Sequence, residues 1–335
     1  GRPTGQSYWT LAPLVGLHVA ASGAIAPKPR AAHMVIGRSI ARLDLPAKLA
    51  GGGFVHDLRL PGMRHARMLR QPRPGASLAR LDEAAIQKAA GGRLDILRRG
   101  DFVAFVAGSE TVARRAAVAA PVHALWQGGD ALSPEMAEAN WLRSQPSDDR
   151  TAGPPPAAHS GLLRHQASYA RPYIAHASLG PSCAVAWMRG GQLTLWSHVQ
   201  GVYPLRQALA EVLSLDPAAI TVHHAHGPGC YGQNGADDAA LDAAVIATLL
   251  PETPIRLLWQ REDEFGFEPV GSAMAIRLEA TLGPDGLPVD LLTEIWSAPH
   301  VGNTRAGANL LATRALPDPP PAIASNESSS PDPGA

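Results

Sequence analysis

Hydrophobic and polar positions along residues 34–127 follow the periods of strands and helices in turn. Phe54–Leu60 alternates with period two and precedes a Pro61-Gly62 turn, which predicts the start of a β-hairpin. Phe102–Ala107 is continuously apolar, as in a strand buried on both faces. The predicted elements are strands at Phe54–Leu60, Met63–Leu69, Leu94–Leu97 and Phe102–Ala107 and helices at Leu81–Ala90 and Glu110–Ala120. Together they predict a self-contained α+β unit.

A second unit is predicted over residues 160–315, with the order strand, strand, helix, strand, glycine-rich turn, helix, strand. It ends in a hairpin whose strands are Ala273–Leu282 and Leu291–Ser297. The Pro-rich residues 128–159 are expected to be an extended linker with one helix at Pro134–Leu142. Residues 1–33 are predicted to be an amino-terminal segment and linker, and residues 316–335 a disordered tail.

The apolar stretch Leu11–Ala26 has an ending similar to that of a signal peptide. Pro13 and His18 lie inside it and only Arg2 precedes it, so an ordinary core helix is the favoured interpretation. Because the sequence does not begin with Met, an earlier targeting segment stays an open alternative. No apolar run approaches the roughly 20 residues of a transmembrane helix.

Charge and cysteine content narrow the class of protein. The 29 basic and 29 acidic side chains cancel, which gives no support to a nucleic-acid-binding or anionic-membrane-binding surface. The two cysteines are too few for a disulfide scaffold or a metal knuckle. Cys183, in the apolar run CAVAW, is expected to be a small buried hydrophobe, whereas Cys230 lies among glycines.

The glycine-rich turn is the strongest candidate for a ligand site. Gly227-Pro-Gly229-Cys-Tyr-Gly232 matches the dinucleotide-binding pattern G-x-G-x-x-G. However, Asn234-Gly235 delays the helix, and the carboxylates of Asp237 and Asp238 in its first turn would repel a pyrophosphate. A nucleotide-binding enzyme is therefore kept as a weaker alternative. No Lys-Ser/Thr follows the last glycine, so the turn is not a P-loop.

Two other groups of side chains could carry chemistry. His224 and His226 share a strand face while His223 points away, so at most two of them could bind one ion, and a zinc site needs about three or four ligands. The charged run Arg261–Glu264, with Glu268, could supply a general base, although such runs at strand ends are more often solvated. No serine nucleophile elbow is present.

Several strings resemble, in order and spacing, one protein family. They are YIAHASLGPSCAVAW, LTLWSHVQGVYPLR, HGPGCYGQNGADDAALDAAVIA and IRLLWQREDEFGFEP. These resemble the molybdopterin-binding large subunit of the xanthine oxidase and aldehyde oxidase superfamily, in the isoquinoline 1-oxidoreductase and nicotinate dehydrogenase branch. Upstream, IGRSIARLDLPAKLAGGGFVHDLRLPGMRHARMLRQPRPGASLARLD and DFVAFVAGSETVARRAA resemble the a/b hammerhead domain of that family. The implied fold is α+β, a hammerhead domain followed by the first molybdopterin-binding domain.

The resemblance implies an oxidoreductase that hydroxylates an N-heteroaromatic compound or an aldehyde with oxygen from water. The implied cofactor is molybdopterin with Mo, in the cytosine dinucleotide form, whose dithiolene holds the metal without a direct protein ligand. By position, Gln200 corresponds to a glutamine that hydrogen-bonds a molybdenum oxygen, and Gly229, Cys230, Tyr231 and Gly232 correspond to the cofactor-contacting loop. Most relatives have Gly-Gly-Phe-Gly at that loop, and they often have Glu where this chain has Gly180.

The implied partners are a 2Fe-2S small subunit, a small-molecule substrate and, as one candidate acceptor, a cytochrome c. The catalytic base of the family lies in a later domain, and nothing after Ala312 resembles it. We therefore expect that this chain needs a missing half or a second polypeptide, and that alone it turns over nothing. The alternative is a truncated, non-catalytic cofactor-binding or assembly module. The compartment is left open between the cytoplasmic and periplasmic sides of the inner membrane.

Overall fold

The computed structural model describes residues 5–16, 18–20, 23–24, 26–298 and 306–317. It divides into two units, one up to Pro46 and one from Ala47 onward. The first unit contains α1 (Tyr8–Leu11) and the short 3-10 helices η1 (Ala12–Leu14) and η2 (Arg30–Ala32). None of the described helices has the length and apolarity needed to cross a membrane.

The predicted core helix at Leu11–Ala26 is wrong for the part of that stretch that the structure describes. α1 ends at Leu11 after four residues, and Pro13 lies in a 3-10 turn. Trp9 is 88% exposed and Leu14 is 77% exposed. A short helix without a buried apolar face gains little beyond its costly nucleation, so it does not extend.

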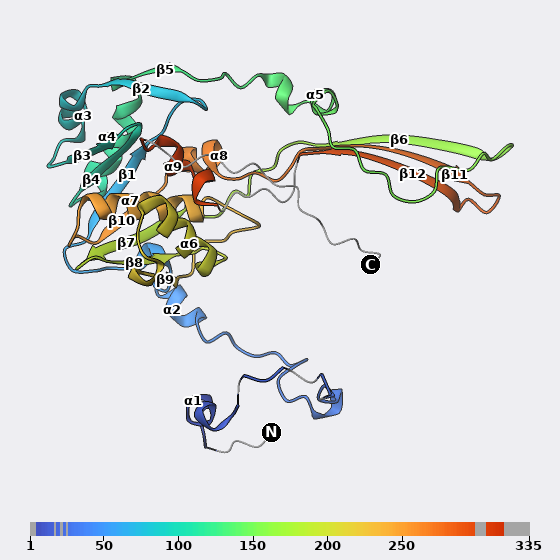
Figure 1. The fold of residues 1–335 in the computed structure, drawn as a ribbon, viewed down its shortest axis with the longest axis horizontal. Helices are drawn as coiled ribbons and strands as arrows, with labels where there is room; N and C mark the ends of the chain where they lie inside the picture. The colour runs from blue at the N-terminus through green and yellow to red at the C-terminus, as the bar shows by residue number, and fades with distance from the viewer. Residues whose placement is uncertain (1–4, 17, 21–22, 25, 299–305, 318–335) are drawn as a thin grey trace. The chain divides into compact units, whose positions relative to one another are not determined.

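The second unit is built on a seven-stranded mixed sheet in the order β3-β4-β1-β10-β7-β8-β9 (Figure 1). β1 runs parallel to β10, with Ala66 beside Leu257, and β8 runs parallel to β9. Strands from both predicted units therefore share one sheet, and the boundaries at residues 127 and 160 stay a prediction. The strands are β1 (Arg64–Leu69), β3 (Asp95–Arg99), β4 (Phe102–Ala107), β7 (Cys183–Arg189), β8 (Gln192–Ser197), β9 (Ile220–His224) and β10 (Ile255–Leu258).

Helices cover both faces of this sheet. α6 (Val202–Leu213) and α7 (Ala236–Leu249) pack on one face, and α3 (Glu83–Ala90) and α4 (Glu110–Ala119) pack on the other (Figure 1). All six residues of β4 are buried, which confirms the prediction from its continuous apolar run. The Asp82 side chain caps α3 by accepting a hydrogen bond from the Ala85 amide at 3.0 Å.

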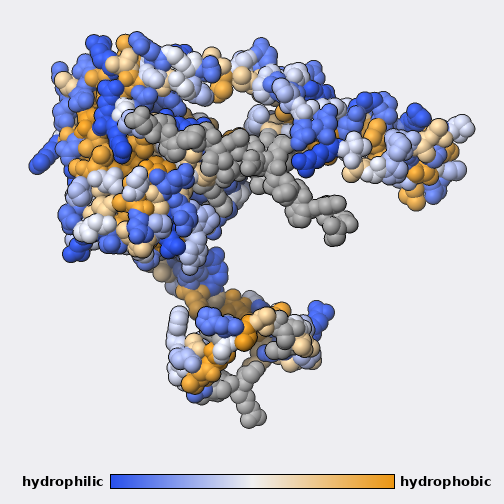
Figure 2. Space-filling model, viewed as in Figure 1, coloured by the Kyte–Doolittle hydropathy of each residue, from blue (hydrophilic) through white to orange (hydrophobic). Residues whose placement is uncertain are grey.

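A long three-stranded sheet in the order β12-β11-β6 forms the other main part of this unit (Figure 1). β11 (Met274–Leu282) and β12 (Pro288–Ser297) confirm the predicted hairpin. β6 (Leu163–Arg171) was not predicted, because LRHQASYAR has no β-branched residue and no clear alternation. Apolar side chains reach the surface near the end of the hairpin, where Leu287 is 63% exposed (Figure 2).

The predicted strand at Phe54–Leu60 is wrong, since the structure has the 3-10 helix η3 (Val55–Asp57) there. The Val55 amide bonds the His226 carbonyl at 2.8 Å, and its side chain packs on Cys183 and Val185. This tertiary packing overrides the alternating pattern. The remaining elements are α2 (Leu45–Leu49), β2 (Ala76–Leu81), η4 (Ala120–His123), β5 (Ala124–Gly128), η5 (Pro134–Ala137), α5 (Ala139–Arg143), η6 (Pro217–Ala219), α8 (Arg261–Phe267), η7 (Gly307–Asn309) and α9 (Leu311–Ala315).

The predicted helix at Pro134–Leu142 is divided between η5 and α5. The predicted disordered tail lies outside the described residues, apart from its first two positions.

Candidate functional site

The glycine-rich turn, residues 227–235, connects β9 to α7. Gly229 and Gly232 have φ angles of +122° and +132°, which L-residues with a Cβ rarely adopt. Tyr231 between them is also left-handed, with φ of +54°. This sequence of unusual angles turns the backbone sharply, and only glycine at positions 229 and 232 allows it without strain.

The turn presents a row of unused backbone donors. Within the described residues, the amides of Gly229, Cys230, Tyr231 and Gly232 donate no hydrogen bond to another group of the chain. Gly229 and Cys230 are half-buried, where amides are nearly always paired, whereas Tyr231 and Gly232 are exposed to solvent. The unpaired amides of residues 229 and 230 are therefore the site feature. Unpaired backbone amides can donate hydrogen bonds to an anion or to a metal-bound oxygen.

The segment of residues 176–182 packs against this turn. The Gln233 amide donates to Nε2 of His176 at 3.1 Å, and Nδ2 of Asn234 donates to Oγ of Ser178 at 3.2 Å. A Cβ at Gly232 would lie 2.4 Å from Nε2 of His176. Position 232 therefore requires glycine for two reasons, its φ angle and its close contact with the His176 imidazole.

All five residues predicted for the cofactor site lie together in the structure. Gln200 follows β8, and its Nε2 donates to the Gly232 carbonyl and lies 3.2 Å from Sγ of Cys230. The Cys230 thiol also donates to the Gly232 carbonyl. The structure thus brings the glutamine to the turn, while its role toward a bound cofactor stays a prediction.

His198, two residues before Gln200, is a neutral imidazole beneath the turn. Burial, reinforced by the nearby His56 and His224, lowers the pKa of His198 to about 4. Its Nε2 accepts from the Cys183 amide at 3.4 Å, which leaves the proton on Nδ1. That Nδ1 is buried without an acceptor among the described residues, and a Cβ at Gly227 would lie 2.6 Å from it.

Asp263 and Glu264 of the charged run Arg261–Glu264 are buried, contrary to the expectation for a strand end, while Glu262 stays exposed. The run forms α8, in which Glu264 is fully buried and Glu268, just after the helix, is 5% exposed. Oε1 of Glu264 accepts from the Ser182 amide, and Oε1 of Glu268 accepts from the His176 amide at 2.7 Å. These backbone amides compensate the buried carboxyl groups. The spacing of Arg261, Glu264 and Glu268 by three and four residues is typical of a helix, and it could have indicated one here.

Carboxylates of the chain itself lie at the amino end of α7. This agrees with the sequence-based argument against a dinucleotide site there. Asp237 and Asp238 are each 6% exposed in its first turn. Oδ1 of Asp238 accepts from the Leu311 amide at 2.7 Å. Burial raises the pKa of Asp238 to about 7 despite that bond.

The histidines of β9 make ordinary structural contacts. The His223 ring stacks on Trp196 with centroids 5.5 Å apart, and Nδ1 of His224 lies 2.9 Å from the Val199 carbonyl. β9 is an edge strand of the sheet, so polar side chains are tolerated there. In the part of the chain that the structure describes, no three His, Cys, Asp or Glu side chains converge as metal ligands.

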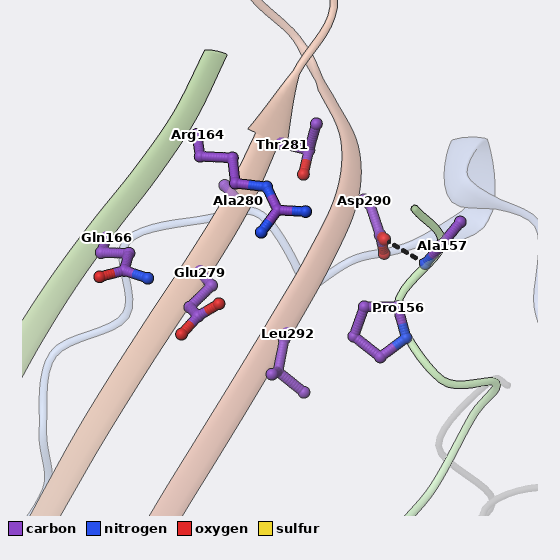
Figure 3. Close-up of a pocket in the computed structure, with 9 residues that line it drawn as sticks. All are labelled: Pro156, Ala157, Arg164, Gln166, Glu279, Ala280, Thr281, Asp290 and Leu292. Carbon is purple, nitrogen blue, oxygen red and sulfur yellow. Dashed lines mark hydrogen bonds between the residues drawn. The ribbon is translucent and has the colours of Figure 1, made fainter. Parts of the chain in front are cut away.

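A separate shallow pocket lies on the three-stranded sheet (Figure 3). Arg164, Glu279 and Asp290 line it, and Oδ2 of Asp290 accepts from the Ala157 amide at 2.7 Å. None of the predicted site residues contributes to it. The glycine-rich turn, with its unpaired amides and close packing, is therefore the better candidate site.

Comparison with known proteins identifies the class to which this turn belongs. Residues 156–310 match the model of the molybdopterin cofactor-binding domain. Residues 156–310 of this chain therefore form a molybdopterin cofactor-binding domain. A molybdopterin cofactor with Mo is the ligand of this class.

Two characterised relatives place the chain within that class. It is similar to one subunit of the nicotinate dehydrogenase of Pseudomonas putida, with 35% identity over 268 residues. It is 27% identical over 284 residues to the beta subunit of isoquinoline 1-oxidoreductase from Brevundimonas diminuta. The matches cover 76% and 78% of this chain but only 22% and 35% of the relatives.

The fold is similar to that of quinoline 2-oxidoreductase from Pseudomonas putida 86. The TM-score is 0.56 at 20% identity, over 77% of this chain and 39% of that one. This likeness confirms a mixed α+β fold of the molybdenum hydroxylase type.

The residues present fit a molybdopterin cofactor. The amides of residues 229–232 are donors without acceptors among the described residues. His198 adds a buried Nδ1–H next to Gly227. This group has no acceptor among the residues that the structure describes. A set of donors of this kind suits the oxygen atoms of an oxo-metal centre and of a pterin phosphate.

Proposed function

We propose that this chain is part of a molybdenum-dependent oxidoreductase that hydroxylates an N-heteroaromatic or aldehyde substrate with oxygen from water. The observation that carries the proposal is the row of amides at residues 229–232 that stay unpaired within the described chain, inside a molybdopterin cofactor-binding domain. The names of the two relatives, which refer to nicotinate and isoquinoline, favour an N-heteroaromatic substrate.

Within this proposal, each residue of the turn has a definite task. When bound, the cofactor supplies the two-electron oxidation of a substrate C–H bond. The amides of Gly229–Gly232 donate hydrogen bonds to its oxygens, and Gln200 exchanges its bond to the Gly232 carbonyl for one to the cofactor. His198 stays neutral at physiological pH, because burial holds its pKa low. The cytosine dinucleotide form of the cofactor is part of the same proposal.

The partners are proposed from the class of protein. The relatives are named as subunits, and this chain spans about a fifth to a third of their length. A 2Fe-2S small subunit would take the electrons, with a cytochrome c as a candidate acceptor. A second polypeptide would contribute the catalytic base. We place the assembled enzyme at either the cytoplasmic or the periplasmic side of the inner membrane.

We also propose that residues 34–127 correspond to the a/b hammerhead domain. In support, β2 and β5 form a separate two-stranded sheet beside α3 and α4. A cofactor-binding or assembly module without its own catalysis is the second candidate function. In its favour, the turn itself supplies hydrogen-bond donors, which suit the holding of a cofactor.

The test is the molybdenum and pterin content of the purified chain from a host that makes the cofactor. We expect near-stoichiometric Mo when the chain is produced together with the proposed partners, and retention of pterin by the chain itself. Absence of both in a well-folded sample, with and without the partners, would overturn the proposal. Retention of pterin without turnover in the complete assembly would favour the assembly module.

A further inference from the structure

We propose that one face of α8, formed by Arg261, Glu264 and Glu268, is the positioning element of the glycine-rich turn. This face fixes the backbone of residues 176–182, and that segment in turn fixes residues 229–234. The inference rests on the proposed function for its biological meaning, but its geometry is independent of any cofactor. The sequence marks this charged run as a candidate general base and gives no sign that it supports the turn.

The first link joins α8 to the segment of residues 176–182. Arg261 donates to the carbonyls of Ser178 at 2.7 Å and Leu179 at 2.9 Å. Oε1 of Glu264 accepts from the Ser182 amide at 2.5 Å. Oε1 of Glu268 accepts from the amides of His176 and Ala177 at 2.7 and 3.4 Å.

The spacing of the three residues explains how they act together. Arg261 and Glu264 are three residues apart on α8, and Glu268, the residue that caps its carboxyl end, follows four residues later, so the three lie along one side of the helix. The Arg261 guanidinium donates to two carbonyls, and the carboxyl groups of Glu264 and Glu268 accept from three amides. The same segment is thus held at both its donors and its acceptors, which leaves its backbone little freedom.

The second link joins residues 176–182 to the turn. His176 receives the Gln233 amide on Nε2, and Ser178 receives Nδ2 of Asn234. Gly180 packs on Pro228, where an added Cβ would lie 2.9 Å from the proline ring. Ala177 has a left-handed φ of +50°, a conformation that persists only where the surroundings impose it. Glu268 holds the backbone just before this φ angle, because its Oε1 accepts from the amides of both His176 and Ala177.

The two carboxyl groups lie close enough to influence each other. Burial raises the pKa of Glu264, and the neighbouring Glu268 raises it further. Both are buried and lie one helical turn apart, and their Oε2 atoms meet no donor among the described residues. Arg261 is engaged with carbonyls. A glutamine at position 268 keeps an oxygen that can accept from the His176 and Ala177 amides, so it preserves the contacts that Oε1 makes.

The experiment is hydrogen–deuterium exchange of the full chain without cofactor, read by mass spectrometry on peptides covering residues 176–182 and 229–237. Glu268→Ala is expected to accelerate exchange at least tenfold in both peptides. The Gln233 amide is the sensitive reporter in the second peptide, because its acceptor is His176. Glu268→Gln is expected to exchange as the parent does.

Glu262→Ala is the matched control, since Glu262 is an exposed carboxylate on the same helix. It should leave both peptides unchanged. Arg261→Met, which removes the two carbonyl contacts without leaving a buried charge, provides an independent route to the same result. Exchange of a peptide from β4 reports whether any variant has lost its global fold.

Acceleration confined to residues 176–182, with residues 229–237 protected as in the parent, would overturn the proposal. So would equal acceleration by Glu268→Ala and Glu268→Gln, or acceleration of β4 to the same degree by both Arg261→Met and Glu268→Ala. Because no cofactor is present in the measurement, these outcomes are distinct from failure of the proposed function, which shows as absent Mo and pterin.

Discussion

The amide nitrogen of Gln233 lies 3.1 Å from Nε2 of His176, a residue 57 positions earlier in the chain. This bond joins the glycine-rich turn to the segment before β7. Gln200, which follows β8, contacts the same turn. The candidate site is therefore assembled from three chain segments. A substitution that displaces one segment should therefore change the backbone positions of the other two.

Replacing Gly232 by Ala tests the close packing of the turn. The new Cβ would lie 2.4 Å from Nε2 of His176 at a backbone φ of +132°. Overpacking and backbone strain each cost about 1–3 kcal/mol, so we expect a loss of stability in that range and reduced pterin retention. Urea unfolding and pterin fluorescence provide the measurements.

Gly153→Ala is the matched control for this variant. Gly153 has a φ of +86° but open space around its Cα, so only the backbone strain applies. Equal stability and equal pterin content of the two variants would contradict the packing argument.

The two cysteines should react differently with a thiol reagent such as dithionitrobenzoate. Cys183 is fully buried, and burial raises its pKa to about 12, so it should stay unreactive in the native chain. Cys230 lies partly exposed in the turn and should account for one thiol per chain. Cys230→Ser should abolish the native reaction, while denaturation should then reveal one remaining thiol.

Bound molybdopterin should slow the labelling of Cys230. Labelling at the same rate in cofactor-loaded and cofactor-free samples would place the cofactor away from the turn.

Asp238 predicts a pH dependence of stability. Its pKa is raised from 3.8 to about 7, so between these values the folded chain holds a proton that the unfolded chain has released. The free energy of unfolding therefore falls as pH rises from about 4 to about 7 through this group. In Asp238→Asn, whose Oδ1 can still accept from the Leu311 amide, that contribution should be absent.

Chemical unfolding at about pH 4.5 and about pH 7.5, on either side of the raised pKa, provides the measurement. The parent should lose stability relative to Asp238→Asn between the two pH values. A parallel pH profile for the two proteins would show that Asp238 is ionised throughout.

The buried ion pair between Arg70 and Asp242 connects β1 to α7 and, through Trp259, to the turn. Asp242 is fully buried and also accepts from Nε1 of Trp259 at 3.0 Å, and Gly235 packs against that indole. Arg70→Met leaves the carboxylate buried without its cation, so we expect a loss of about 3–5 kcal/mol in the free energy of unfolding.

Arg277→Met is the comparison, because the ion pair of Arg277 with Glu294 is exposed. Exposed pairs contribute about 0–1 kcal/mol. Urea denaturation of both variants distinguishes them, and a loss below about 1 kcal/mol for Arg70→Met would show that the buried pair is not needed for stability.

Local patterns were sufficient for most of the secondary structure. The continuous apolar run of Phe102–Ala107 could only be a buried strand, and the turn residues Gly283–Gly286 placed the β11–β12 hairpin correctly. The glycines at positions 229 and 232 also indicated a special backbone from sequence alone, because φ near +120° to +130° is open to glycine and strained for other residues. These features depend on residues that are neighbours in the chain.

Only the tertiary structure decided the features that depend on distant segments. Val55 lies in a 3-10 helix although its segment alternates like a strand, because its side chain packs on Cys183 and its amide bonds the His226 carbonyl. Glu264 and Glu268 became buried because the amides of residues 176–182 compensate their desolvation, whereas a charged run by itself predicts a solvated surface. Sequence patterns report the periodicity of a segment, and the partner that compensates a buried polar group lies elsewhere in the chain.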